Sequence, residues 1–85
     1  MASEYEIKRL LRAAAEKLLD RKLSEQEISK LYQLYQQEYG TPYNKTIKAL
    51  SEFSALSESH IIEKRSSSDD FDRVMQNLKR ELEGK

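Results

Sequence analysis

The chain specifies the beginning of a helix at five places, and this feature constrains its fold more than any other. Ser3-Glu4-Tyr5-Glu6 and Ser24-Glu25-Gln26-Glu27 are capping boxes, in which the Ser oxygen accepts from a backbone N–H three residues later and the Glu carboxylate returns to the N–H of the Ser. Thr41-Pro42 places a proline at the first helical position, where its missing N–H costs nothing. Ser57 and the Ser66–Ser68 cluster each precede acidic residues and supply two further starts. Because no stretch alternates with period two, the fold class is predicted to be all-α.

Apolar residues at spacings of three and four extend each start into an amphipathic stripe. The expected helices cover about Glu4–Leu19, Ser24 to a stop at Gly40, Pro42 to about Ala55, Ser57 to about Arg65, and about Asp69–Glu83, with a loop at Ser66–Ser68. These helices predict a single helical domain over residues 1–85, a compact bundle of four to five short helices. The expected core contains Leu11, Ile28, Leu31, Ile47, Leu50, Phe71, Val74 and Leu78.

Charge and composition exclude several kinds of partner. Lys plus Arg and Asp plus Glu both number 15, and there is no cysteine. Residues 1–40 carry seven charges of each sign and residues 41–85 carry eight of each, so no basic tail attracts nucleic acid or a membrane surface. No apolar run is long enough to span a bilayer, and the first residues lack the basic-then-apolar order of a signal peptide. We therefore expect a cytoplasmic protein with no membrane partner, no cofactor and no evident small-molecule substrate.

No group of residues predicts catalysis. His60 is the single imidazole, and its neighbour Ser59 points about 100° away from it on a helix. Ser57 is needed as a cap, and no third residue is placed to orient the ring. The carboxylates at Asp69, Asp70 and Asp72 lack the spacing of a calcium loop, and they complement the dipole of a helix that begins there. We expect no enzyme activity and no metal site.

Four tyrosines lie close together in the sequence, and three share the second helical stripe. Buried rings with hydroxyls at the rim explain this pattern better than a nucleic-acid platform, because the residues between them are mostly Gln, Leu and Glu. Tyrosines that are half in a core also suit a partner surface. The candidate protein-binding residues are therefore Tyr32, Tyr35 and Tyr39, and incomplete cover of these rings also predicts self-association.

Residues 49–61, Ala-Leu-Ser-Glu-Phe-Ser-Ala-Leu-Ser-Glu-Ser-His-Ile, resemble a helix-turn-helix of the phage-repressor type. The resemblance is close over 13 residues and looser over about 45, and Ala55 stands where that family has a turn glycine. It implies DNA recognition through Ser57, Glu58, Ser59, Ile62 and Glu63. Two acids among five groove-facing positions repel phosphates, which dominate such affinities. The DNA-binding candidates under this alternative are Lys45, Lys48, Ser57, Ser59, Lys64 and Arg65.

Two functional hypotheses arise from the sequence. The first is a small non-enzymatic interaction module, such as a regulator, inhibitor or adaptor, that binds a protein through a helix face. The alternative is a DNA-binding regulator that uses residues 49–65.

Overall fold

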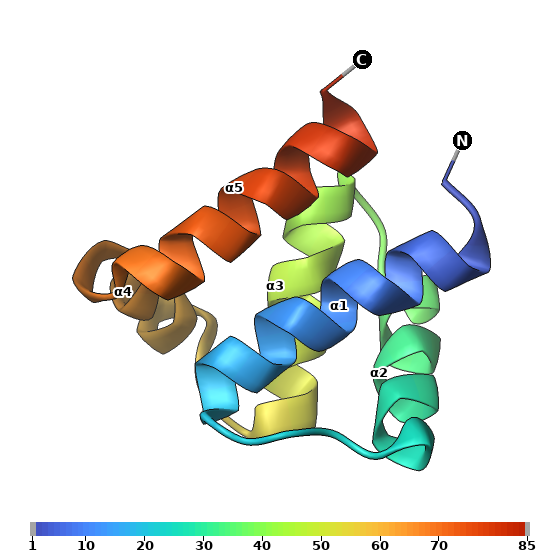
Figure 1. Cartoon of the computed structure of the whole chain (residues 1–85), viewed down its shortest axis with the longest axis horizontal. Helices are drawn as coiled ribbons and strands as arrows, with labels where there is room; N and C mark the ends of the chain where they lie inside the picture. The colour runs from blue at the N-terminus through green and yellow to red at the C-terminus, as the bar shows by residue number, and fades with distance from the viewer. Residues whose placement is uncertain (1, 85) are drawn as a thin grey trace.

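Each of the five helices begins at the cap that the sequence predicts. The protein is described by a computed structural model that covers residues 2–84, and Figure 1 shows the helices α1 (Glu4–Leu19), α2 (Glu25–Gln37), α3 (Pro42–Ser54), α4 (Glu58–Ser67) and α5 (Asp69–Glu83). At every start the hydroxyl of the cap accepts a hydrogen bond from the backbone N–H three residues later. The capping residues are Ser3, Ser24, Thr41, Ser57 and Ser68. The all-α bundle is confirmed.

The ends of the helices differ from the prediction in two places. Helix α2 ends at Gln37 and not at Gly40, so Tyr39 lies in the linker to α3 and does not continue the apolar stripe. Helix α4 continues through Ser67, so the loop predicted at Ser66–Ser68 is wrong. Ser68 alone separates α4 from α5, because its N–H caps the end of the first helix and its hydroxyl caps the start of the second.

The first of the two predicted capping boxes forms only in part. At Ser24 both halves are present, since the Glu27 carboxylate accepts from the N–H of Ser24. At Ser3 the hydroxyl accepts from Glu6, but the Glu6 carboxylate accepts a hydrogen bond from Arg9. The Arg9 guanidinium, one turn away, therefore bonds the Glu6 carboxylate that a complete capping box would use.

Helix α3 forms the centre of the bundle and contacts each of the other four helices. Figure 1 shows α1 and α5 running in opposite directions side by side, with α3 behind them and α2 and α4 on either flank. No helix among residues 2–84 is long and apolar enough to cross a membrane.

Seven of the eight predicted core residues are buried, and the eighth is corrected. Val74 is only half-buried, and Met75 occupies the fully buried position beside it on α5. Leu34 is also buried, and so is Thr46, whose hydroxyl donates to the Pro42 carbonyl at 2.8 Å. Residues from all five helices therefore share one core.

Candidate protein-binding surface

The three candidate tyrosines do not form one surface. Tyr35 is buried at 5% exposure, and this burial raises the pKa of its hydroxyl. The Lys45 ammonium lies 4.4 Å from the centre of the Tyr35 ring. Tyr32 is half-buried, with the Lys8 ammonium 5.3 Å from its ring. Tyr39 is 88% exposed. Of the three residues, Tyr39 is therefore the one whose ring is open to a partner.

Tyr39 lines a hollow of about 270 Å³ together with an exposed residue of α4. That residue is Ile62, which is 52% exposed although it is a large aliphatic side chain. The linker, α3 and α4 together form this hollow, whose lining residues are Tyr39, Gly40, Tyr43, Asn44, Ile47, Lys48, Glu58 and Ile62. Tyr39 lies beyond the end of α2 because Glu38 is already extended, and Gly40 adopts a φ of +115°, which glycine tolerates without strain, before α3 begins. We call these residues the Tyr39–Ile62 hollow.

Tyr43 is held in place as the inner wall of the hollow. Its backbone N–H donates to a Glu83 carboxylate oxygen at 2.7 Å, and its hydroxyl accepts from the Arg65 guanidinium at 2.7 Å. Arg65 in turn donates to Asp72, and this hydrogen bond raises the pKa of Arg65. The Lys79 ammonium lies 5.5 Å from the centre of the Tyr43 ring. Groups from α4 and α5 therefore fix the wall before any partner arrives.

Hydroxyl groups set the turn that positions Ile62. Ala55 ends α3 in the left-handed region, with a φ of 64°, which costs a residue with a Cβ about 1–2 kcal/mol. Ser51 donates to the Leu56 carbonyl at 2.5 Å, and Ser54 accepts from the Leu56 N–H at 3.2 Å. These bonds stabilise the three-residue connection 55–57 and place α4 beside α3, so that Ile62 faces the hollow.

Sequence reasoning did not identify Ile62 as a protein-binding residue. The one signal in the sequence was the pair Ile61-Ile62, because neighbours on a helix point about 100° apart and a short helix that packs on one side of the bundle can leave one of the two outside. Ile61 is fully buried, and Ile62 is left outside.

The residues predicted for DNA binding are divided among other contacts. Lys45 lies over Tyr35, Arg65 is bonded to Asp72 and Tyr43, and the Ser57 hydroxyl caps α4. Lys48 lines the Tyr39–Ile62 hollow beside Glu58, Ser59 is exposed, and Lys64 is half-buried. The helix-turn-helix positions 57, 58, 59, 62 and 63 are all exposed.

The residues considered for catalysis or metal binding do not converge. His60 is exposed, and its backbone N–H donates to the Ser57 cap. Asp72 accepts from Arg65 and Gln76, whereas Asp69 and Asp70 begin α5. Within residues 2–84 no group of three or more His, Cys, Asp or Glu side chains is placed to hold a metal ion.

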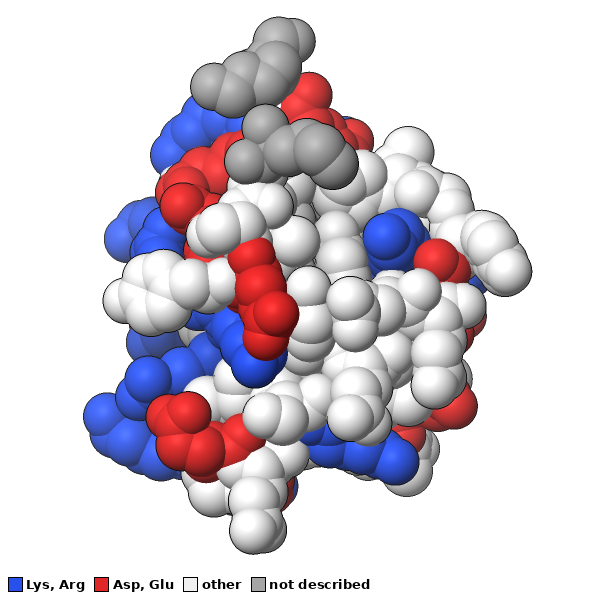
Figure 2. Space-filling model, turned by 90° about the vertical axis from the view of Figure 1, so that its right-hand side faces the viewer, with Lys and Arg blue, Asp and Glu red and all other residues white. Residues whose placement is uncertain are grey.

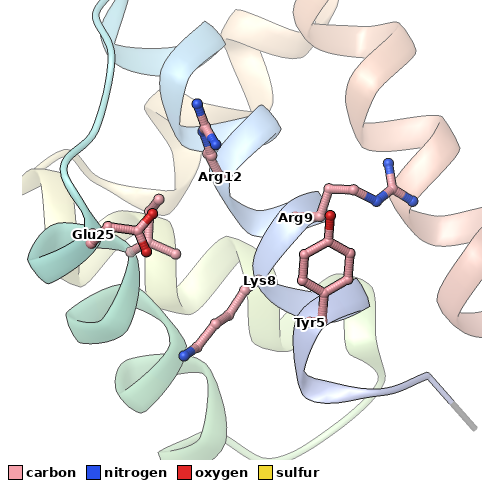
Figure 3. Close-up of a pocket in the computed structure, with 6 residues that line it drawn as sticks. Tyr5, Lys8, Arg9, Arg12 and Glu25 are labelled. Carbon is pink, nitrogen blue, oxygen red and sulfur yellow. The ribbon is translucent and has the colours of Figure 1, made fainter.

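A second, smaller depression lies between α1 and α2. Figure 3 shows its side chains pointing in different directions, with Lys8 reaching toward α2 and Arg12 directed away from Lys8. Lys8 pairs with Glu4 at 2.8 Å, and Arg12 pairs with Glu16 at 3.1 Å. Because nearby acids already neutralise these cations, the depression is a weaker candidate site than the Tyr39–Ile62 hollow.

Comparisons of the chain with protein-family models, with curated proteins and with solved structures found no match. The function is therefore inferred from the geometry of the described residues alone.

Proposed function

We propose that the protein is a small interaction module that binds another protein through the Tyr39–Ile62 hollow. The observation that supports this proposal most directly is that the exposed side chains of Tyr39 and Ile62 line the same hollow. Tyr39 is 88% exposed and Ile62 is 52% exposed, and large apolar side chains that line a common hollow are typical of partner sites. Aromatic anchors beside a polar rim are the usual composition of such sites.

The shape of the hollow favours a protein segment over a small molecule. Its two apolar walls are open, with Tyr39 88% exposed and Ile62 52% exposed, whereas a ligand pocket buries about 70–90% of the surface of a small molecule. The rim carries one cation and one anion, Lys48 and Glu58, so it selects neither acidic nor basic partners strongly. The occupant that fits is a partner segment that inserts one apolar side chain between Tyr39 and Ile62 and hydrogen-bonds to the rim.

Affinity capture with matched baits tests this function. Tyr39→Ser/Ile62→Ser removes both exposed anchors, and Tyr5→Ser removes a tyrosine that is 77% exposed but lies outside the hollow. We expect at least one protein to be retained by the parent and by Tyr5→Ser and to be lost from the double variant. If every protein that the parent captures is also held by the double variant, the hollow is not the binding site.

A second copy of the chain is the other possible occupant of the hollow, and a separate measurement of mass in solution tests for it. Sedimentation equilibrium at micromolar concentration gives the answer, because the monomer mass is 10.0 kDa. A dimer that the double variant abolishes would assign the hollow to self-association, as an isologous two-fold contact.

DNA recognition is the second candidate function. It is favoured by the three-residue turn at 55–57, where Ala55 has the left-handed conformation that a turn glycine usually supplies, and by the exposure of the recognition positions on α4. Under this alternative, binding to duplex DNA weakens steeply with salt, and Lys64→Ala lowers the salt slope by about one phosphate contact. No binding at ~50 mM salt would remove this candidate.

A further inference from the structure

The antiparallel pair α1 and α5 encloses a furrow whose charge differs from that of the chain as a whole. Two adjoining hollows run along this furrow, and Ala13 and Val74 belong to both, so they form its floor. Their linings carry six cations, Arg9, Lys17, Arg21, Lys22, Arg73 and Arg80. Only two carboxylates line it, Glu16 and Asp20. Cations therefore outnumber carboxylates among the residues that line the furrow, although the chain as a whole carries no net charge.

Figure 2 shows Lys and Arg side chains gathered along one edge of the molecule. That edge belongs to the side that faces the viewer in Figure 1, where α1 and α5 lie. The fold brings these cations together, because those of α1 and those of α5 are more than 50 residues apart in the sequence.

Some of these cations are already paired within the protein. Arg9 pairs with Glu6 at 2.8 Å and with Glu81 at 3.4 Å, and Arg21 pairs with Glu27 at 2.8 Å. In contrast, Arg73, Arg80 and Lys22 form no ion pair with any other residue in the range 2–84. Arg80 donates only to the Asn77 side-chain carbonyl. Guanidinium groups of this kind remain able to hold carboxylates in bidentate contacts.

The spacing of the two arginines identifies the shape of the ligand. Arg73 and Arg80 are seven residues apart on α5, which places them on the same face about 10.5 Å apart along the helix axis. Two carboxylates seven residues apart on a partner helix have the same separation. Between them, apolar side chains of that helix would rest on Ala13 and Val74. We propose that the α1–α5 furrow binds an acidic amphipathic helix of a partner protein, as a second docking surface separate from the Tyr39–Ile62 hollow.

Other anionic partners fit the furrow less well. A nucleic-acid backbone presents phosphates continuously and would pass the furrow carboxylates Glu16 and Asp20, whereas a helix can place its acidic side chains only opposite Arg73 and Arg80 and uncharged ones elsewhere. A membrane surface requires bulky apolar side chains that enter the lipid, and the floor offers only Ala13 and Val74.

Fluorescence anisotropy with a labelled synthetic peptide tests the proposal. The peptide is a helix of about 18 residues of Ala, Leu and Glu, because shorter isolated helices are marginal in water. It carries Glu at positions seven apart with Leu between them on one face, and a scrambled peptide of the same composition is its control. We expect Arg73→Gln/Arg80→Gln to weaken binding about tenfold, since each exposed pair contributes modestly.

Matched variants separate the furrow from a general effect of charge. Lys30→Gln/Lys64→Gln removes the same charge from positions outside both the furrow and the Tyr39–Ile62 hollow and is expected to change the affinity less than about twofold. Ala13→Gln leaves the charge unchanged but covers the floor, and it is expected to weaken binding as well. The thermal midpoint of each variant confirms that it is folded.

Three results would overturn the proposal. The first is binding of the designed peptide weaker than ~1 mM, or equal to that of the scrambled peptide. The second is an equal loss in the furrow variant and the lysine control. The third is a duplex DNA that binds more tightly than the peptide and depends on Arg73 and Arg80, which would assign the furrow to nucleic acid. None of these measurements involves Tyr39 or Ile62, so failure here leaves the proposed function untouched.

Discussion

Replacement of Leu78 by Ala should remove much of the stability of the domain. Leu78 has no exposed surface and lies on α5, which contacts α1, α3 and α4. Truncation of a fully buried leucine costs about 3–5 kcal/mol, through the lost transfer free energy and the cavity that is left. A domain of 85 residues has a net stability of about 4–13 kcal/mol. The substitution therefore removes between a quarter and the whole of the free energy of unfolding.

Thermal and urea unfolding monitored by circular dichroism measure this loss. At about 4–8 °C per kcal/mol, the lower limit of 3 kcal/mol corresponds to a fall of about 12–24 °C in the midpoint. The matched control is Ile62→Ala, which shortens an aliphatic side chain that is 52% exposed and should cost less than about 1 kcal/mol. If Leu78→Ala melts within a few degrees of the parent, or if Ile62→Ala costs as much, the assignment of core and surface is wrong.

Two further perturbations test the local geometry. Ala55→Gly should raise the free energy of unfolding by about 0.5–1 kcal/mol, because the Cβ penalty of about 1–2 kcal/mol at a φ of 64° is removed while the greater freedom of glycine in the unfolded chain offsets part of the gain. A midpoint of thermal unfolding that does not rise would show that the turn is not strained. The pKa of Glu27 is lowered to about 2, first by the hydrogen bond from Arg21 and then by the backbone N–H of Ser24. Because the folded pKa lies below the unfolded value of 4.5, the stabilisation is fully present above pH 4.5 and is lost as the pH falls toward 2. Glu27→Gln should therefore flatten the pH dependence of the unfolding midpoint in that window, and an unchanged profile would contradict the role of this carboxylate.

The starts of the helices could be predicted from the sequence because each is a local signal. A hydroxyl and the N–H three residues later complete a cap without any distant group, and all five caps form as predicted. The ends depend more on the course of the chain beyond each helix. Helix α2 stops at Gln37, where Glu38 is extended and its N–H donates to the Tyr35 carbonyl, and Thr41 is extended as well because a proline follows it. Helix α4 passes through Ser66 and Ser67 because Ser68 alone can end one helix and begin the next.

The surfaces could be predicted less well than the helices, because they combine residues that are distant in sequence. The tyrosine stripe indicated that Tyr39 was a candidate. Because α2 ends at Gln37, Tyr35 lies within the helix and is buried, whereas Tyr39 lies beyond it and is exposed. Ile62 joins Tyr39 only through the turn at Ala55. The furrow joins Arg9 on α1 to Arg73 and Arg80 on α5, and nothing in the local pattern places these helices side by side.

Photocrosslinking from position 39 is the sharpest test of binding through the Tyr39–Ile62 hollow. A photoreactive phenylalanine analogue at position 39 touches whatever occupies the hollow, and the same analogue at position 5 reports on an equally open site elsewhere. We expect a discrete protein adduct from position 39 that disappears when Ile62→Ser is added, and no such adduct from position 5. The same adducts from both positions, or an adduct at 39 that survives Ile62→Ser, would contradict binding at this site.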